Sequence, residues 1–285
     1  MPPRHLSHSA RESLERCAKA YYLRYFTPAP RRPALWSIGG SAVHEVTEIY
    51  DREQFELGGE PREWTERAIK GAWDYSFGEF LDKAFSAEAD EYKWGRSSSE
   101  PIEVWNVNGP LFIQSYIDWR ERSPYKIWTT PDGQPAIELD VSGMLPGCPV
   151  EIKGYVDRIF HDPVMDKLVD VDLKTGKKPP KDGQQFGTYA ALVKAKYGVQ
   201  TDLGVPFLNR KGTLGKPYEL AEYTPEAVGA VFGETWEKVQ AGEFPANGFP
   251  ENCFVCDLQW SCGAIGGPLA KIYDPSHPEH ETPPF

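Results

Sequence analysis

The sequence predicts an α/β protein of the α+β kind, with a helical first half and a strand-rich second half. Up to about residue 130, apolar and aromatic residues recur at the three- and four-residue spacing of helices. After Pro131, short β-branched runs of largely alternating polarity lie between glycine and proline breaks. A length of 285 residues with 40% hydrophobic residues is sufficient for a buried core, in one large domain or two small ones.

The first half contains helix patterns over residues 9–26, 37–50, 63–85 and 108–122. The first helix is expected to begin at the capping box Ser9-x-x-Glu12 and to end at the proline-rich stretch 28–33. Aromatic residues such as Trp73 and Trp119 occupy many apolar positions of the last two patterns. These segments predict an α-helical block ahead of the strands.

The second half begins with three expected strands of an antiparallel meander, over residues 136–142, 150–160 and 167–173. A helix over 183–197, extended runs over 201–209 and 216–223, and a helix over 225–241 follow. The proline-rich end after Lys271 is expected to be a poorly ordered tail. We therefore divide the chain into a helical region (1–130), a core (131–245), a cysteine-bearing segment (246–270) and a tail (271–285).

The net charge of −11 argues at first against a nucleic-acid partner, because binding phosphates needs local positive potential. However, residues 1–33 carry a net charge of +5, whereas residues 45–103 carry 16 acidic and 7 basic residues. The acidic excess therefore does not forbid a basic surface elsewhere. The acidic segment would narrow a channel or contact a partner, and the sequence does not choose between these roles.

The sequence contains no apolar run of about 18 residues and no basic-then-apolar secretory signal at its start. We therefore expect no membrane association and a cytoplasmic, intracellular location. In that reducing setting, five cysteines indicate a metal or redox site, or buried thiols, rather than disulfides.

Two acidic strand residues and a lysine form a candidate metal site. Asp172 and Lys174 lie two residues apart on one strand and therefore share a face, and Asp157 would lie beside Asp172 if the strands are neighbours. Converging carboxylates suit Mg²⁺ or Mn²⁺, and the ammonium would orient a water molecule or stabilise a developing anion. The alternative is a set of solvated ion pairs. Gln185 and Tyr189, one helical turn apart, favour the site.

These residues belong to an ordered series that begins with a histidine on the second predicted helix and ends with the Gln-x-x-x-Tyr pair. In this order the sequence resembles the RecB-like branch of the PD-(D/E)XK nuclease superfamily. The resemblance implies a mixed central β-sheet flanked by helices, with a restriction-endonuclease-like core over residues 131–245. The series consists of His44 in Gly40-Ser-Ala-Val-His44-Glu-Val46, Glu138, Asp157 in Gly-x-x-Asp-Arg, Asp172-x-Lys174 and Gln185-x-x-x-Tyr189.

The resemblance also implies a role for each of these residues. Asp157, Asp172 and the Leu173 carbonyl would hold the divalent cation, and His44 would be a further ligand; by itself, a single histidine is more often structural. Lys174 would assist the water nucleophile, and Gln185 and Tyr189 would position the site or the DNA strand. Glu138 would be a further catalytic residue, or equally a solvent-facing strand residue. The third motif is Asp-x-Lys, whereas Glu-x-Lys is commoner in the family. Both motifs supply a carboxylate, so the difference affects the geometry of the site more than the mechanism.

The cysteines near the C-terminus form the pattern Cys253-x-x-Cys256-x5-Cys262. The triplet alone suits zinc or an iron–sulfur cluster about equally. With Cys17 added, the pattern resembles the iron–sulfur nucleases of this superfamily, namely the AddB-type nuclease domain and the CRISPR adaptation nucleases. This implies a structural [4Fe–4S] cluster held by these four cysteines. Alternatively, Cys17 is a small apolar residue on a buried helix face. Cys148 is left over and is expected to be a buried or loop thiol.

The resemblance implies a metal-dependent deoxyribonuclease, in a prokaryotic or viral setting. It favours exonuclease action on single-stranded DNA or DNA ends, with a role in recombination, repair or DNA processing. Lys177, Lys178 and Lys181 would bind DNA phosphates, and exposed members of the nine tryptophans would stack on single strands. The sequence lacks a P-loop, so any ATP-driven unwinding would come from a helicase partner. The alternative function is a non-catalytic iron–sulfur module that binds DNA ends or a helicase.

Overall fold

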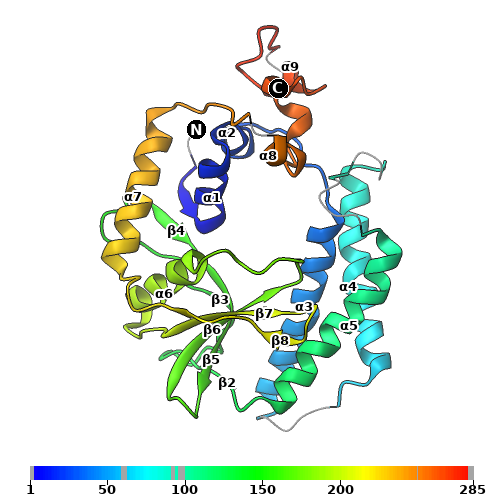
Figure 1. Cartoon of the computed structure of the whole chain (residues 1–285), viewed down its shortest axis with the longest axis vertical. Coiled ribbons are helices and arrows are strands. Elements are labelled where there is room, and N and C mark those ends of the chain that lie inside the picture. Colours follow the sequence, from blue (N-terminus) through cyan, green and yellow to red (C-terminus); the bar gives the residue numbers. More distant parts are fainter. Residues whose placement is uncertain (1–2, 59–62, 91–93, 96–99, 249, 282–285) are drawn as a thin grey trace.

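The computed structural model describes residues 3–58, 63–90, 94–95, 100–248 and 250–281. The described residues form a seven-stranded mixed sheet at the centre of the molecule. Helices lie on both sides of this sheet (Figure 1). This arrangement confirms the predicted fold class. Within the described residues, no helix combines the length and the apolar character that crossing a membrane requires.

The hydrogen-bonded order of this sheet is β2 (Lys126–Ile127), β5 (Tyr155–Asp162), β6 (Lys167–Lys174), β7 (Leu203–Leu208) and β8 (Thr213–Leu214), with β3 (Ile137–Asp140) paired to β5 and β9 (Tyr218–Glu219) to β7. The strands β6 and β7 run parallel, because the helix α6 (Gln184–Tyr197) connects them as a crossover, and the other pairs of the sheet are antiparallel. The predicted meander is present as β3, β5 and β6.

The strand predicted over 150–160 is divided in two at Gly154. The strand β4 (Glu151–Lys153) leaves the main sheet and pairs in parallel with β1 (His5–Ser7), which the sequence pattern does not reveal. A Cβ atom on Gly154 would lie 2.7 Å from a Leu192 methyl carbon of α6, so the glycine lets the chain pass close under that helix.

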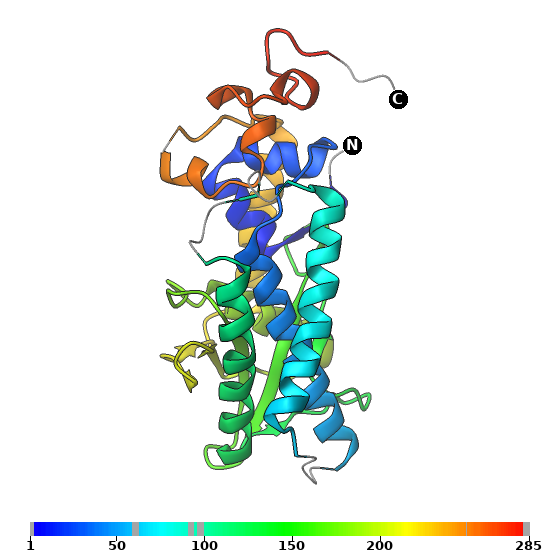
Figure 2. The same cartoon turned by 90° about the vertical axis from the view of Figure 1, so that its right-hand side faces the viewer.

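The two faces of the sheet bury separate cores. The helices α3 (Leu35–Glu56), α4 (Glu66–Ala87) and α5 (Ile102–Arg122) cover one face and run side by side, as seen in Figure 2. The helices α6 and α7 (Pro225–Ala241) cover the other face. Val169, Val171 and Leu173 of β6 face α3–α5, so the intervening even-numbered residues face the opposite side.

The first predicted helix is two helices, α1 (His8–Arg16) and α2 (Ala18–Phe26), separated by Cys17 in an extended conformation. The prediction of one continuous helix is wrong because the C-terminal segment pairs with the break: the Lys19 amide donates to the Pro245 carbonyl at 3.1 Å. The predicted capping box is also wrong. Ser7 caps α1 by accepting from the Ala10 amide, since β1 continues as far as Ser7.

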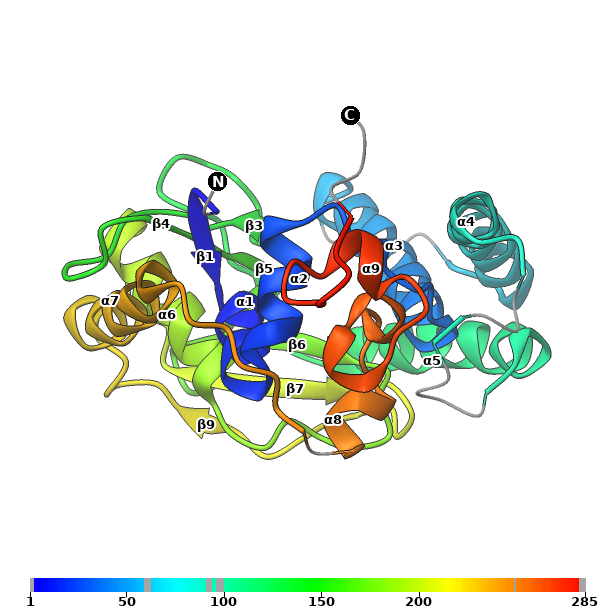
Figure 3. The same ribbon diagram turned by 90° about the horizontal axis from the view of Figure 1, so that it is seen from above.

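The C-terminal segment packs beside α1 and α2, as Figures 1 and 3 show. It contains α8 (Pro250–Phe254), the 3₁₀ turns η2 (Gln259–Ser261) and η3 (Gly263–Ile265), and α9 (Ala270–Tyr273). The prediction of a poorly ordered tail is wrong for residues 271–281. The fully buried Asp274 carboxylate accepts from the Gly263 amide at 2.8 Å and pairs with Lys19 Nζ at 3.1 Å. Residues 282–285 lie outside the described residues.

Candidate active site

Three side chains from three elements converge at the ends of the central strands. Ligand-type atoms of His44 (α3), Glu138 (β3) and Asp157 (β5) all lie within 4.8 Å of one another. His44 Nδ1 is 3.4 Å from Asp157 Oδ2, and His44 Nε2 is 3.0 Å from the Leu173 carbonyl oxygen. The Leu173 amide donates to Asp157 Oδ2 at 2.8 Å, which fixes β5 against β6 at this point. Such a set of nitrogen and oxygen donors suits a divalent cation.

A second group lies beside the first, on β6 and α6. Lys174 Nζ is 2.6 Å from Asp172 Oδ2 and donates to Gln185 Oε1 at 3.1 Å. The Gln185 amide in turn donates to Asp172 Oδ1 at 2.8 Å and lies 3.4 Å from the Tyr189 hydroxyl. The structure therefore brings together the predicted lysine, glutamine and tyrosine around Asp172. The three-residue group contains Glu138, whereas Asp172 lies in the lysine-bound group.

The electrostatics of the site follow from several carboxyl groups in a small volume. Burial, and then the charge of Asp157, raises the pKa of Glu138 to about 7. Burial also raises the pKa of Asp172, although Lys174 opposes the shift. For Lys174, burial alone would lower the pKa, but the charges of Asp172 and Asp157 outweigh it and raise the pKa above its usual value. The lysine is therefore an ammonium at neutral pH, and a divalent cation would relieve repulsion among the carboxylates.

Asp170 is a further acidic residue of the site face that the sequence analysis missed. It lies on β6 two residues before Asp172 and is 1% exposed. Among the described residues, neither of its carboxyl oxygens has a hydrogen-bond partner. Burial, and then the charges of Asp172 and Asp157, raise the pKa of Asp170 well above its usual value. The two-residue alternation of Asp170, Asp172 and Lys174 was the available signal.

A network of buried charged residues centred on Asp51 and Arg158 contacts the site from the protein interior. The sequence did not reveal it. Arg158, which follows the motif residue Asp157, is fully buried and donates to Asp51 Oδ2 at 2.6 Å and to Glu138 Oε1 at 3.2 Å. Asp51 of α3 also accepts from Arg120 Nε at 2.9 Å and from the Tyr116 hydroxyl at 2.6 Å. The network therefore links α3 and α5 to β5 and to one of the three converging side chains. A Gly-x-x-Asp-Arg motif alone does not distinguish a buried arginine from a surface ion pair.

Two hollows flank the converging side chains. One of about 500 Å³ lies between α1 and the strands, where Lys153, Gln185 and Tyr189 line it together with His8. The other, of about 470 Å³, lies along α3 and is lined by residues that include Trp36, His44, Glu138 and Phe80. The site is thus open on two sides, and each opening contains residues of the motif series.

The predicted DNA-binding lysines lie in the loop that follows β6. Lys177, Lys178 and Lys181 are exposed, and Lys177 Nζ is 3.4 Å from Glu100 Oε1. Glu100 also accepts two hydrogen bonds from Arg210. The loop therefore places cationic side chains near the end of the strand that bears Lys174.

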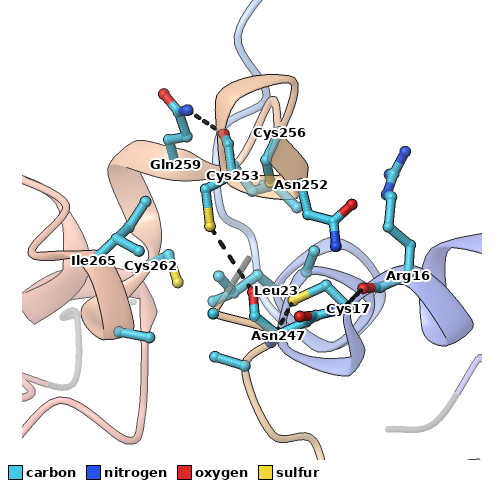
Figure 4. A pocket seen from close by; sticks show the side chains of 15 residues that line it. Arg16, Cys17, Leu23, Asn247, Asn252, Cys253, Cys256, Gln259, Cys262 and Ile265 are labelled. Atoms are coloured by element: carbon cyan, nitrogen blue, oxygen red, sulfur yellow. Dashed lines mark hydrogen bonds between the residues drawn. The ribbon is translucent and has the colours of Figure 1, made fainter. Parts of the chain in front are cut away.

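The four predicted cluster cysteines line one cavity of about 50 Å³, between the break in the first helix pair and the C-terminal segment. In Figure 4 the sulfur atoms of Cys17, Cys253 and Cys262 point into the same space. The Asn247 amide donates to Cys17 Sγ at 3.4 Å. In the described part of the chain, no three of these sulfurs lie within 4.8 Å of one another. A single zinc ion would hold its thiolates about 3.8 Å apart, given Zn–S bonds of about 2.3 Å.

Cys148 lies elsewhere, as expected. It is buried in the core on the α6–α7 face of the sheet and donates to the Val150 carbonyl. Burial raises the pKa of its thiol. Its position and its hydrogen bond fit a packing role.

Comparison with known proteins identifies the class to which this fold and site belong. The chain belongs to the PD-(D/E)XK nuclease superfamily, whose family model matches residues 5–263. Membership indicates a metal-dependent nuclease that acts on DNA. The chain is similar to the Gene 69 protein of Mycobacterium phage D29, with 33% identity over 258 residues that cover 87% of this chain and 92% of that protein. It is also similar to the Gene 69 protein of Mycobacterium phage L5, with 28% identity over 271 residues and the same coverage.

One solved structure, titled "Crystal structure of SSO0001", aligns with 77% of this chain and 97% of that chain. The TM-score is 0.35 and the sequence identity is 13%, values too low to indicate a shared fold or activity.

Proposed function

We propose that the protein is a divalent-metal-dependent deoxyribonuclease that degrades single-stranded DNA from its ends. The observation that carries the proposal is the convergence of His44, Glu138 and Asp157 next to the ion pair of Asp172 and Lys174. Bringing several carboxylates together is costly unless a cation offsets their repulsion, and a protein that only binds DNA does not need such a group.

The residues of the site divide into ion-holding and phosphate-facing groups. His44, Asp157, Glu138 and the Leu173 carbonyl would hold Mg²⁺ or Mn²⁺, together with Asp172. When bound, the cation would lower the pKa of a water nucleophile and neutralise charge on the phosphate. Lys174 stays protonated because its pKa is raised, so it would donate hydrogen bonds to the water or to the developing oxyanion rather than act as a base.

Gln185 and Tyr189 would be positioning residues. The Gln185 side chain accepts from Lys174 and donates to Asp172, so it holds the ammonium and the carboxylate in one arrangement. Tyr189 lies at the end of this chain of contacts and lines the hollow beneath α1. The burial that raises the pKa of Tyr189 keeps its hydroxyl neutral, so it acts as a hydrogen-bonding group only.

The preference for single strands is supported by the position of α1. Arg11 of α1 donates to Gln184 of α6 at 2.9 Å, and the pKa of Glu12 on the same helix is lowered mainly by His8 and to a smaller extent by the charges of Arg16 and Lys174. A helix held this close to the site leaves two hollows rather than a broad face for a duplex. Lys177, Lys178 and Lys181 would bind the strand by its phosphates.

We also propose that Cys17, Cys253, Cys256 and Cys262 hold a structural [4Fe–4S] cluster. In its support, the four thiols line one cavity, and in the described part of the chain no three of their sulfur atoms lie within 4.8 Å of one another, whereas a single zinc ion would hold its thiolates about 3.8 Å apart. The cluster would connect the first helix pair to the C-terminal segment. Visible absorption, with iron and sulfide in the purified protein, would support it, whereas zinc without sulfide would refute it.

The nuclease proposal is tested with end-labelled linear and circular DNA, single- and double-stranded, in Mn²⁺ or Mg²⁺. We expect wild type to degrade linear single strands, Lys174→Ala to be inactive, and the exposed-surface variant Lys70→Ala to retain activity. Cleavage of circles would show an endonuclease. Binding of DNA ends without cleavage would instead indicate the non-catalytic module, and a helicase would then be the partner to seek.

The phage relatives fit a setting in a prokaryotic cytoplasm. There, end-directed degradation would serve DNA recombination, repair or processing, with any unwinding supplied by a partner. Coexpression with a helicase, followed by co-purification, tests that association.

A further inference from the structure

An exposed tryptophan lies beside the candidate metal site on the same helix. Trp36 is 49% exposed and lines the hollow of about 470 Å³ that also contains His44 and Glu138. Trp36, Gly40 and His44 are spaced by four residues on α3 and therefore follow one face of the helix. Eight residues of helix place Trp36 about 12 Å from His44 along the axis. This distance is suitable for a substrate that reaches from the metal site to the indole ring.

The surface between these two residues is made of small side chains. Ser37, Gly40 and Ser41 line the hollow together with Thr175 from the end of β6. A Cβ atom on Gly40 would lie 3.1 Å from the Thr175 hydroxyl oxygen. The glycine therefore leaves the surface of α3 free of a side chain at this point and lets β6 end close to the helix. Phe80 of α4 lines the same hollow. The hollow therefore has room for a flat group and contains two aromatic rings.

The acidic side chains that line the hollow determine which part of a DNA strand would lie in it. Glu45 and Glu48 of α3 line it, as does Glu138. Glu45 accepts a hydrogen bond from Ser76, and Glu48 pairs with Arg52 at 2.7 Å, so both are held in place. Carboxylates repel phosphates, whereas nucleobases are neutral and have flat faces. The hollow thus suits bases, while the sugar–phosphate chain would follow the cationic loop after β6.

We propose that Trp36 is a stacking platform for an unpaired nucleobase next to the scissile phosphate, an inference that rests on the proposed nuclease function. A base in a duplex already has its faces covered by its neighbours, so a platform of this kind selects single strands. Every base has a flat face, so the selection is by strandedness rather than by sequence.

The test compares Trp36→Ala and Trp36→Phe with Tyr75→Ala, which removes a 73% exposed aromatic ring of α4 outside the hollow. Binding of a labelled single-stranded oligonucleotide is measured with Ca²⁺ in place of Mg²⁺. We expect Trp36→Ala to bind about 5- to 150-fold more weakly, from the usual contribution of one stacked base. Trp36→Phe should recover part of the loss, and Tyr75→Ala should match wild type.

A second measurement uses an oligonucleotide with abasic positions beside the scissile phosphate. The abasic substrate should weaken binding to wild type but not to Trp36→Ala, because the same contact is then already absent. Equal weakening of both proteins overturns the proposal, as does a Trp36→Ala protein that binds the intact strand as wild type does. Cleavage of DNA by the wild-type protein in Mn²⁺ is measured separately and does not depend on either result. Failure of the stacking proposal can therefore be distinguished from failure of the nuclease proposal.

Discussion

Replacing Asp51 tests whether the buried charge network holds the site together. Asp51 is fully buried, and its carboxylate binds Arg158, Arg120 and Tyr116. Burial opposes its ionisation, but the two arginines outweigh this cost and lower the pKa of Asp51. Asp51→Ala leaves the fully buried Arg158 without its main counter-charge, with Glu138 remaining at 3.2 Å.

The expected loss is large because a buried charge is left uncompensated. Breaking a buried ion pair from one side costs about 3–5 kcal/mol, a large share of the roughly 5–15 kcal/mol by which domains are stable. At about 2–4 °C per kcal/mol for a chain of this size, the melting temperature should fall by about 6–20 °C. The same change should weaken Mn²⁺ binding, since Arg158 holds Glu138.

Thermal unfolding followed by circular dichroism measures the first effect, and isothermal titration with Mn²⁺ measures the second. The matched control is Asp74→Ala, which removes an aspartate of an exposed helical pair with Lys70 and should change stability by at most about 0.5 kcal/mol. If Asp51→Ala melts within about 2 °C of wild type, the network does not carry the stability assigned to it, and the reasoning is refuted.

Three further changes have expected outcomes. The pKa of Glu138 is raised to about 7, so protons compete with the cation below that pH. Mn²⁺ should therefore raise the melting temperature more at pH 8 than at pH 6, and Glu138→Gln should reduce this difference. Lys19→Met removes the partner of a buried carboxylate in the C-terminal segment and should speed limited proteolysis there; unchanged cleavage would contradict this. Gly109→Ala would place a Cβ atom 2.3 Å from the Trp73 ring and should cost about 1–3 kcal/mol in chemical denaturation, whereas Gly78→Ala, with open space around it, should not destabilise.

The helices and strands of the core could be predicted from the sequence because their signals are local. The helix predicted over 225–241 coincides with α7, which begins after the capping residue Thr224 and ends at Gly242 in a left-handed conformation. The long strand β6 was equally clear, since its apolar residues alternate with Asp170 and Asp172. The order of the motif residues along the chain can also be read directly from the sequence.

Other features depend on partners that are distant in sequence, and no local pattern encodes them. The helix break at Cys17 depends on Pro245, and β1 exists because it pairs with β4. The buried state of Arg158 depends on Asp51, which lies 107 residues earlier in the chain.

The sequence alone therefore determined the class of fold, the order of the main strands and helices of the core, and the residue types available for a metal-dependent nuclease. Only the tertiary structure decided that Glu138 joins His44 and Asp157, that Asp170 is buried with no hydrogen-bond partner among the described residues, and that Trp36 is exposed. The physical reason is that propensity and periodicity act within a few residues, whereas distances, burial and pKa depend on which distant segments pack together.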